Sequence, residues 1–460
     1  MLSVALNIFI KYNMRNCNQF VPIPKICVRR SNLIEDALNS FLNENWGLKS
    51  PIASFLTQSR LVVEFLGEVG VDSGGLRREF FSLLVDELLN CEYGLFKLCS
   101  RDTAYWLTGY ELGFAIQTEL IGFVIGLALL NGDTLKVPFP KVFFRKLLSS
   151  NRNLLKSTIF KNYQSSSEQY IMFKPVTSTN FIVLKVMEKD QLILRSNYNP
   201  DLTKFIYLRQ IDKVYKSLTQ LPEYTPTLQD LEEIEPEIAD NIYKLYLMSC
   251  DSNIANLNLT FSVTKDCLGE FQEIPLKDKN GNEYSMEKLV TNQNVLEYIE
   301  ALLNYYLIYN IETQFDNFYL GFHRACACSL FMHLTPEQLA FTLNGIEGEI
   351  DVNHLEKVTQ YLNGYDEHSQ VIKWFWVCFR MLSSSDKKKL LMFITGSERI
   401  PLGGPEALEL KITNPGGSSD RLPWAHTCEK ILLLPNYPSY ELLSDKLRIA
   451  IEHNRGFGLY

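Results

Sequence analysis

A polar stretch near the end of the chain, residues 360–370 (QYLNGYDEHSQ), separates two regions whose apolar residues recur at helical spacing. The apolar residues of the following region, 372–382, form a single stripe along one predicted helix. Asn363 and Gly364 lie inside the polar stretch, and glycine tolerates backbone angles that regular helices and strands do not use. The sequence therefore predicts two bodies of unequal size, joined by a flexible hinge at these two residues.

The two predicted bodies, residues 1–364 and 365–460, combine helices with short strands. Segment 112–130 has the apolar pattern of a helix and ends at an Asn-Gly pair, which favours helix termination. The alternating apolar residues of 257–263 predict a half-buried strand. Residues 151–225, rich in serine, asparagine and lysine, are interpreted as an atypical insert, either a small β-rich unit or a loosely ordered loop. The expected fold class is α+β, with a mainly helical first body and a small α/β second body.

The composition argues against several classes of protein. A net charge of −8 is unfavourable for binding nucleic acid, because neutralising phosphates requires clustered lysine and arginine. The longest apolar run after the N-terminus, residues 120–130, has about half the length that a membrane-spanning helix needs. The ten cysteines show no spacing of a disulfide framework, which favours a reducing compartment. We therefore expect a cytoplasmic or nuclear protein with no membrane span and no nucleic-acid partner.

Four stretches, in their order and approximate spacing, resemble the HECT ubiquitin ligase domain. They begin at residues 63, 121, 393 and 421 and read VEFLGEVGVDSGGLRREFFSLL, IGFVIGLALLNG, FITGSERIPLGG and RLPWAHTCEKILLLPNYPSYELLSDKLRIAIEHNRGFGLY. Together they are far more specific than any short motif alone. The resemblance covers nearly the whole chain except the predicted insert.

The resemblance implies a bilobal HECT fold and a ubiquitin-protein ligase activity. The N-lobe would include a small mixed subdomain at about 247–325 that docks a ubiquitin-conjugating enzyme, and the C-lobe would carry the catalytic Cys428. In this family, the corresponding cysteine accepts ubiquitin as a thioester and transfers it to a lysine of a protein substrate. The implied partners are therefore a conjugating enzyme, ubiquitin and a protein substrate, with no metal and no organic cofactor.

The chemistry of a thiol suits both steps at Cys428. Exchange of one thioester for another is nearly neutral in energy, so it requires a thiolate and good positioning of the reactants. A thiolate is also a good leaving group when a lysine amine attacks. His426, two positions earlier in HTC, would lie on the same side of an extended segment as Cys428. It could lower the thiol pKa, relay a proton, or only hydrogen-bond the loop. The other nine cysteines are interpreted as small buried hydrophobic residues.

Three further residues match positions that the family uses. Phe457 is fourth from the end of the chain, where HECT ligases use a phenylalanine in the transfer step; packing in a core is the alternative. Tyr93 matches a position that binds a second, non-covalent ubiquitin in some members, although a purely structural role competes with this interpretation. The partner aromatic of that exosite is replaced by Leu268, which puts the exosite in doubt.

Other interpretations of the motifs are weaker. A cysteine hydrolase acting on ubiquitin conjugates would need a general-base histidine and an orienting Asn or Asp, and no papain-like signature surrounds Cys428. A non-catalytic HECT-like binding module is disfavoured by the retained HTC triplet and Phe457. The spacing of His323, Cys326 and Cys328 matches no common structural zinc site, so no metal is expected there.

Overall fold

The computed structural model describes the greater part of the chain outside the N-terminal and C-terminal ends. The described residues are 25–41, 61–68, 75–99, 104–110, 113, 115–149, 161–165, 168–173, 182–187, 191–195, 222–251, 253–267, 269–325, 334–345, 349–400, 404–417, 419–427 and 429–452.

Among the first 150 residues, those that the structure describes form a parallel strand pair, a β-hairpin and four α-helices. The elements are β1 (Lys25–Val28), the 3₁₀ turn η1 (Arg30–Asn32), α2 (Leu33–Phe41), β2 (Val62–Phe65), α4 (Gly75–Leu88), the 3₁₀ turn η2 (Cys91–Tyr93), β3 (Phe96–Leu98), β4 (Tyr105–Leu107), α5 (Ala115–Asn131) and α6 (Lys141–Leu147). β1 pairs with β2 in parallel, and β3 pairs with β4 antiparallel. Alternate residues of β1 and β2 are buried, so each strand presents one face to the core.

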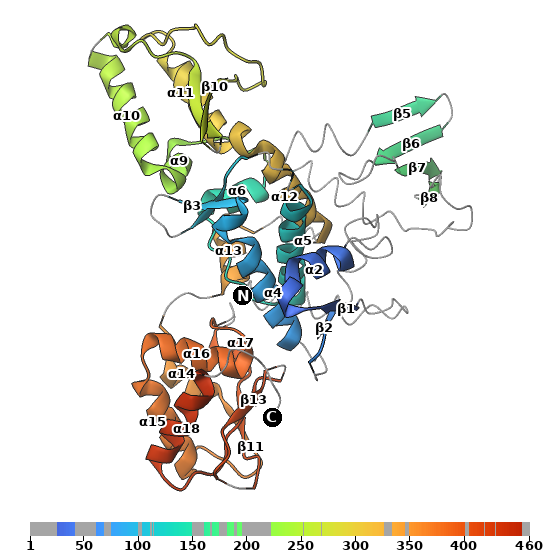
Figure 1. Cartoon of the computed structure of the whole chain (residues 1–460), viewed down its shortest axis with the longest axis vertical. Helices are drawn as coiled ribbons and strands as arrows, with labels where there is room; N and C mark the ends of the chain where they lie inside the picture. The colour runs from blue at the N-terminus through green and yellow to red at the C-terminus, as the bar shows by residue number, and fades with distance from the viewer. Residues whose placement is uncertain are drawn as a thin grey trace.

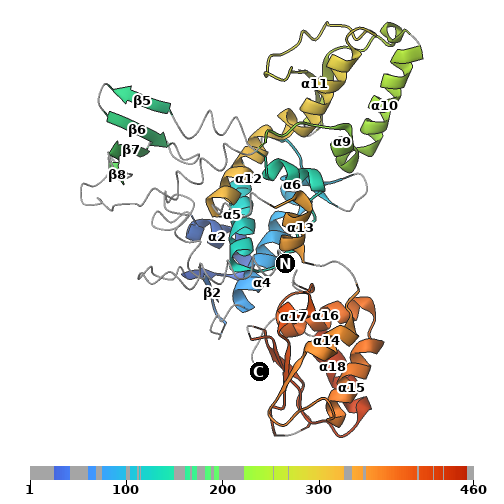
Figure 2. The same ribbon diagram turned by 180° about the vertical axis from the view of Figure 1, so that it is seen from behind.

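Helix α5 is the centre of the N-terminal part of the molecule. Its residues from Thr118 to Leu129 are all buried, and it packs against α2, α4 and two helices from later in the chain. It packs along α12 (Glu312–Ala325), and both views show the two helices side by side (Figures 1 and 2). The helices approach closely where each carries a glycine. A Cβ atom at Gly122 would lie 2.1 Å from the carbonyl oxygen of Phe318, and one at Gly321 would lie 1.9 Å from that of Glu119.

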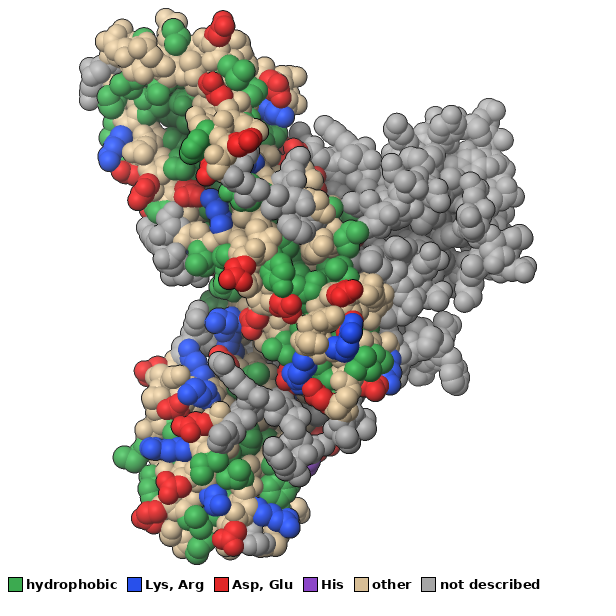
Figure 3. Space-filling model, in the orientation of Figure 1, with side chains coloured by type: hydrophobic (Ala, Val, Ile, Leu, Met, Phe, Trp, Pro, Cys, Tyr) green, Lys and Arg blue, Asp and Glu red, His purple; other side chains and the backbone are tan. Residues whose placement is uncertain are grey.

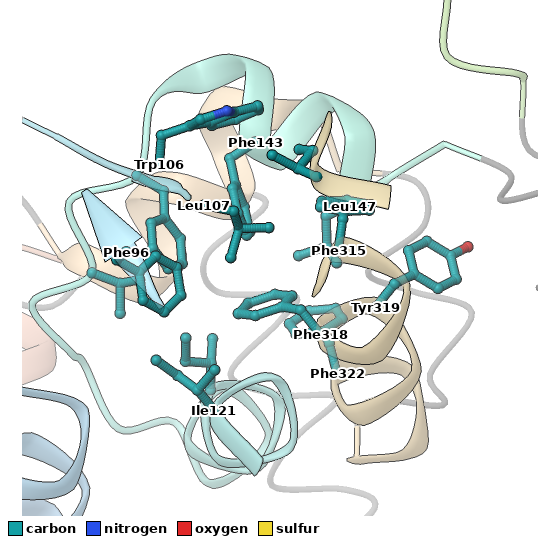
Figure 4. Close-up of a cluster of buried hydrophobic side chains, with 14 of the residues drawn as sticks. Phe96, Trp106, Leu107, Ile121, Phe143, Leu147, Phe315, Phe318, Tyr319 and Phe322 are labelled. Carbon is teal, nitrogen blue, oxygen red and sulfur yellow. The ribbon is translucent and has the colours of Figure 1, made fainter. Parts of the chain in front are cut away.

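Aromatic side chains fill the space between α5, α6, α12 and the β3–β4 hairpin (Figure 4). Phe143 of α6 contacts its neighbours edge-on, with ring centroids 4.9 Å from Phe318 and 5.9 Å from Trp106. Edge-to-face geometry favours the ring quadrupoles in addition to the burial of apolar area. These residues belong to one hydrophobic cluster of residues between Ile26 and Leu343, called here the N-terminal core.

Of residues 222–325, the part from 236 to 307 forms the end of the molecule that lies farthest from the C-terminal region (Figures 1 and 2). The elements are α9 (Leu228–Ile234), α10 (Pro236–Asp251), the 3₁₀ turn η4 (Ile254–Leu257), β9 (Ser262–Cys267), β10 (Glu270–Pro275), α11 (Val295–Leu307) and the 3₁₀ turn η5 (Tyr309–Ile311), followed by α12. β9 and β10 pair antiparallel. The strand predicted at 257–263 is largely wrong, since the chain makes a 3₁₀ turn and a single bridge at Thr260 before β9 begins. Phe261 is nevertheless fully buried, which accounts for the apolar pattern.

In the stretch interpreted as an insert, the described residues include four antiparallel strands. These are β5 (Lys161–Ser165), β6 (Glu168–Phe173), β7 (Ile182–Met187) and β8 (Gln191–Arg195), paired in sequence order. Of the two alternatives predicted for this stretch, the structure shows the β-rich one.

The C-terminal part of the chain has a core of its own, called here the C-terminal core, whose residues lie between Val352 and Ile451. The elements from residue 334 onward are α13 (Pro336–Asn344), which belongs to the N-terminal core, then α14 (Val352–Val358), β11 (Gln360–Leu362), α15 (Gln370–Met381), α16 (Ser384–Thr395), α17 (Pro405–Leu408), β12 (Lys411–Thr413), β13 (Trp424–His426), β14 (Ile431–Leu433) and α18 (Tyr440–Glu452). The sheet order is β11-β12-β14-β13, with β13 antiparallel to β14 and the other pairs parallel. Ser383 caps α16 by accepting a hydrogen bond from the Asp386 amide, as the sequence predicts.

The division between the two cores lies earlier than the predicted boundary at residue 364. α13 ends in the N-terminal core at Asn344, whereas Val352 and Leu355 of α14 are buried in the C-terminal core. β11 also pairs with β12 of the C-terminal sheet. Residues 349–364 therefore pack with the second body, which we call the C-terminal unit, and the N-terminal unit ends at about residue 345.

The described residues combine helices with several small sheets, which places the protein in the α+β class. Among them, no helix has both the length and the apolar character needed to cross a membrane.

Candidate active site

The residue predicted to be the nucleophile, Cys428, belongs to the loop of a β-hairpin in the C-terminal unit. β13 and β14 pair antiparallel as far as His426 and Ile431, which leaves residues 427–430 as the connecting loop. The amide of Glu429 donates a hydrogen bond to the His426 carbonyl at 3.1 Å and closes the turn. Cys428 itself lies outside the described residues.

The base of this loop is fixed to the centre of the sheet. Lys430 has a left-handed backbone (φ 56°), and its carbonyl accepts a hydrogen bond from the Lys411 amide at 2.9 Å. Its ammonium group donates to the carbonyl of Ala407 at 3.3 Å. Leu432, two residues further along β14, is fully buried in the C-terminal core. The hairpin therefore presents its loop from a rigid sheet.

Two adjacent arginines of α4 connect this loop with the N-terminal unit. Asp133 accepts hydrogen bonds at its two carboxylate oxygens from Nε of Arg77 (2.7 Å) and Nε of Arg78 (3.1 Å). Nη1 of Arg78 then donates to the backbone carbonyls of Thr395 (3.1 Å) and Thr427 (3.3 Å). Thr427 directly precedes Cys428, so a charged group of the N-terminal unit holds the peptide group next to the predicted nucleophile.

Two more hydrogen bonds join the units beside the Arg78 contact. Oγ1 of Thr134 lies 3.0 Å from Oγ of Ser397, and Nη1 of Arg399 donates to the carbonyl of Asn344 at 3.1 Å. The turn that follows α16 therefore contacts both the end of α13 and the loop after α5.

The sequence motifs predict no role for Arg77, Arg78 or Asp133, although the first motif contains the two arginines and the second ends just before Asp133. The sequence does contain a signal for a buried ion pair, because two arginines lie at the start of an apolar helix. If such arginines are buried, they require an acidic partner. The distance of about fifty residues to Asp133 left that partner unidentified. The backbone carbonyls that Arg78 contacts carry no sequence signature.

His426 is exposed and is the last residue of β13. Thr427 begins the turn, so the alternation of an extended strand ends before Cys428 is reached. The premise that His426 and Cys428 share one side of an extended segment therefore has no support from the described backbone. A helper role for His426 stays a prediction.

The two residues of the predicted ubiquitin exosite belong to different parts of the N-terminal unit. Tyr93 ends η2 with an exposed ring (42%), and its hydroxyl donates to Glu87 at 3.3 Å. Partial burial of the hydroxyl, together with Glu87, raises the pKa of Tyr93. Leu268 lies outside the described residues, in the turn between β9 and β10. The exosite stays a prediction.

The predicted hinge residues lie inside the C-terminal unit. Asn363 (φ 51°) and Gly364 (φ 85°) form a turn just after β11. The side-chain amide of Asn363 donates to Oγ1 of Thr413 at 2.8 Å. These residues turn the chain between two strands of the C-terminal sheet, and their role as a hinge stays a prediction.

The interpretation of the nine other cysteines as buried is only partly correct. Cys99 and Cys378 are buried, and burial raises the pKa of the Cys99 thiol to about 11 and that of Cys378 as well. Cys27, Cys91 and Cys250 are exposed. Exposure alone does not make a thiol reactive, since a reactive thiol also requires a lowered pKa.

The described residues contain no group of histidine, cysteine and acidic side chains able to hold a metal ion. His323 is buried, and its Nε2 donates to the Leu147 carbonyl at 3.1 Å. Cys326 and Cys328 lie outside the described residues, and so does Phe457.

Comparisons with known proteins agree with the sequence motifs. A family model described as "HECT-domain (ubiquitin-transferase)" matches residues 82–195 and 204–460, including the strands β5–β8 and leaving 196–203 of the expected insert unmatched. The chain is 30% identical over 433 residues to the human "Probable E3 ubiquitin-protein ligase HECTD2", a match covering 94% of this chain and 46% of that protein. It is 28% identical to the human "Probable E3 ubiquitin-protein ligase HERC4" (94% of this chain, 33% of that protein) and 27% identical to the human "E3 ubiquitin-protein ligase NEDD4" (98% and 28%).

The chain thus spans less than half the length of these relatives. The family model nevertheless matches well over half of its residues, and the match includes the loop that carries Cys428. The chain belongs to the HECT-domain (ubiquitin-transferase) family.

Proposed function

We propose that this chain is the catalytic domain of a ubiquitin-protein ligase that carries ubiquitin as a thioester on Cys428. The observation that supports this most directly is the hairpin loop of residues 427–430. It presents Cys428 from a small unit with its own core, and it lies within the match to the ubiquitin-transferase family.

The proposed reaction has two steps. In the first, the Cys428 thiolate attacks the carbonyl carbon of the thioester that joins ubiquitin to a conjugating enzyme, and the conjugating enzyme leaves as a thiolate. In the second, the amine of a substrate lysine attacks the new thioester, an amide forms, the amine loses a proton, and Cys428 leaves as a thiolate. Positioning is the main requirement because neither step needs a redox partner or a large driving force.

We propose that the two units are the N-lobe and C-lobe of a bilobal HECT fold. One cysteine must meet the conjugating enzyme and then the substrate lysine, so the unit that carries it must move between them. The chain passes from one core to the other between Leu343 and Val352, and we place the pivot there. Compared with the 363–364 turn, this segment is the better candidate because its two ends pack against different cores.

The outward face of α10 is the proposed docking surface for the conjugating enzyme. Tyr243, Tyr246 and Leu247 follow helical spacing and are 51%, 42% and 45% exposed. The opposite face of α10, with Ile242 and Leu245, is buried in the N-terminal core. Figure 3 shows hydrophobic side chains interspersed with acidic ones at this end of the molecule. An exposed apolar patch with a polar surround is typical of a protein-binding surface.

Roles are also proposed for four other residues. His426 is close in sequence to Cys428 and exposed, so it is available for proton transfer near the loop. From the family resemblance, Phe457 is proposed to act in the transfer step, and Tyr93 with Leu268 in binding a second ubiquitin.

The decisive experiment is incubation with activating enzyme, conjugating enzyme, ATP and ubiquitin, followed by electrophoresis with and without reductant. We expect a ubiquitin adduct that disappears with reductant and is absent from Cys428→Ala. Cys378→Ala is the matched control, because that thiol is buried and its pKa is raised. An adduct that persists in Cys428→Ala would contradict the site. Cleavage of ubiquitin conjugates would indicate a hydrolase, and neither activity would indicate a binding module.

The docking surface is tested in the same assay. Tyr243→Ala combined with Leu247→Ala should slow adduct formation strongly at low conjugating-enzyme concentration, and a high concentration should partly restore it. Phe341→Ala is the control, since Phe341 of α13 is also exposed (52%) but lies outside the surface. An unchanged dependence on the conjugating-enzyme concentration would refute the assignment.

A further inference from the structure

The Arg78 side chain is held rigidly on the N-terminal side. Asp133 is 2% exposed, and it receives Nε and Nη2 of Arg77 (2.7 and 3.1 Å) in addition to Nε of Arg78. Arg77 is also buried, at 4% exposure. A carboxylate with this many charge-assisted donors in a dry site has little freedom to move. The guanidinium of Arg78 therefore points toward the C-terminal unit from a fixed base.

The atoms that Arg78 contacts on the C-terminal side belong to two separate segments. Thr395 is the last residue of α16, so its carbonyl has no acceptor role within the helix and carries part of the negative end of the helix dipole. Thr427, which is 8% exposed, belongs to the Cys428 loop. We call the two hydrogen bonds from Nη1 of Arg78 to these carbonyls the Arg78 bridge.

Gly396, which follows α16 with a φ of 73°, lies beside the Arg78 bridge. A Cβ atom added there would lie 3.9 Å from Cδ of Arg78 and 3.8 Å from Cβ of Thr427, so the native chain leaves room for a methyl group at this point. The helix end and the hairpin loop are thus joined to the N-terminal unit by the Arg78 bridge and by the Thr134–Ser397 hydrogen bond.

This contact belongs to an arrangement in which the Cys428 loop is remote from the proposed docking surface. The C-terminal unit and α10 occupy opposite ends of the molecule in both views (Figures 1 and 2). Loading of Cys428 requires the loop to reach a conjugating enzyme bound at α10, which is incompatible with the Arg78 bridge. The Arg78 bridge can therefore form only before Cys428 is loaded with ubiquitin or after loading is complete.

We propose that Arg78 is a positioning residue for the second step, in which ubiquitin passes from Cys428 to a lysine. The charged guanidinium of Arg78 donates to the carbonyl of Thr427, directly before the cysteine, and so restricts the motion of the loop. A restricted loop presents the thioester to the lysine amine from one direction. This role of Arg78 rests on the proposed function, because transfer to a lysine is the second of the two proposed steps. Asp133 is the residue that orients Arg78.

The test separates the two steps by single-turnover kinetics. The protein is first loaded from a ubiquitin-charged conjugating enzyme, and loading is then quenched and free lysine added. Arg78→Ala should slow the discharge of the thioester about tenfold, the loss expected for hydrogen bonds from a charged donor. Its loading rate should stay equal or increase, because the arrangement that competes with loading is weakened. The discharge rate of Arg78→Lys should fall between those of the wild type and Arg78→Ala. An ammonium group cannot bond Asp133 and two carbonyls in one plane as a guanidinium can.

Arg380→Ala is the matched control, since Arg380 contacts Asn353 and Glu356 entirely within the C-terminal unit. It should leave both rates unchanged. Equal loss of loading and discharge in Arg78→Ala, with an unchanged melting temperature, would overturn the proposal, as would an unchanged discharge rate. If Arg78→Ala fails to fold, Arg78→Lys and Thr134→Ala take its place, and a discharge rate equal to wild type in both would refute it.

A second measurement is independent of activity. Small-angle X-ray scattering should show a larger maximum dimension for Arg78→Ala than for the wild type and Arg380→Ala, because the two units separate more often. Identical scattering curves would overturn the Arg78 bridge itself. If the wild type forms no thioester, the proposed function fails on that result, whereas scattering still decides whether Arg78 holds the units together.

Discussion

Replacing Gly122 by alanine should destabilise the N-terminal unit, although alanine is normally the better helix former. The added Cβ would lie 2.1 Å from the carbonyl oxygen of Phe318 and 2.9 Å from its carbonyl carbon, both in the backbone of α12. Gly321→Ala places the same group on the opposite helix, 1.9 Å from the carbonyl oxygen of Glu119. Backbone atoms cannot rotate away as a side chain can, so the two helices must separate.

The size of the effect follows from these distances. Carbon and oxygen in contact are normally about 3.3–3.6 Å apart, so each substitution requires a displacement of about 1 Å or more. Overpacking of this kind costs about 1–3 kcal/mol, and alanine returns about 1 kcal/mol through its helix propensity. Because the clash is with backbone atoms, the cost lies at the upper end of this range, about 3 kcal/mol, and we expect a net loss of about 2 kcal/mol for each single substitution. The double substitution should cost less than the sum, because one separation of the helices relieves both clashes.

Urea unfolding followed by circular dichroism measures this loss directly. Gly132→Ala is the control, because Gly132 follows the same helix with a φ of 70° and no atom lies within 4 Å of the added Cβ. The free energy of unfolding of Gly132→Ala should fall by only about 1 kcal/mol, the cost of placing an alanine in a left-handed backbone conformation. Wild-type stability in Gly122→Ala, or strict additivity in the double variant, would refute the close helix contact.

Two further predictions concern buried titratable groups in the same core. Burial lowers the pKa of Lys146 from 10.5 to about 7 while its ammonium group donates to the Leu307 carbonyl. Between about pH 7 and pH 10.5, the Lys146 amine of the unfolded chain holds a proton that the folded chain lacks, so the free energy of unfolding should rise with pH. In urea titrations at several pH values, Lys146→Met should not show this rise. Burial likewise lowers the pKa of His323 from 6.5 to about 4, so stability should fall as the pH decreases from 6.5 to 4. His323→Gln should reduce this acid sensitivity, and a slope equal to the wild type would exclude His323 as its source.

Elements whose signals are local could be predicted from the sequence. The Asn131-Gly132 pair ends α5 as expected, because glycine accepts the left-handed conformation that closes a helix. The Ser383–Asp386 cap of α16 was predictable for the same reason, since all its atoms lie within one turn. The prediction of Cys428 as the nucleophile comes from its motif and stays a prediction, and the structure adds the pairing of β13 with β14 on either side of it.

Features that depend on distant pairing could not be predicted in this way. Gly364 marks a break in composition, but whether that break is a hinge or a turn depends on the pairing of β11 with β12, about fifty residues later. The strand expected at 257–263 failed because the burial of Phe261 in a turn produces the same alternation as a half-buried strand.

The close crossing of α5 and α12 also has a consequence for the site. Asp133 follows α5 directly, and its amide bonds the carbonyl of Ala128 within the last turn, so its position depends on where α12 allows α5 to lie. Asp133 orients Arg78, and Arg78 contacts the carbonyl next to Cys428. Two glycines deep in the core are thus coupled to the active-site loop through three short contacts. We therefore expect the contact between the glycines of α5 and α12 to affect the position of Arg78, and of the loop predicted to carry the nucleophile, as well as the stability of the core.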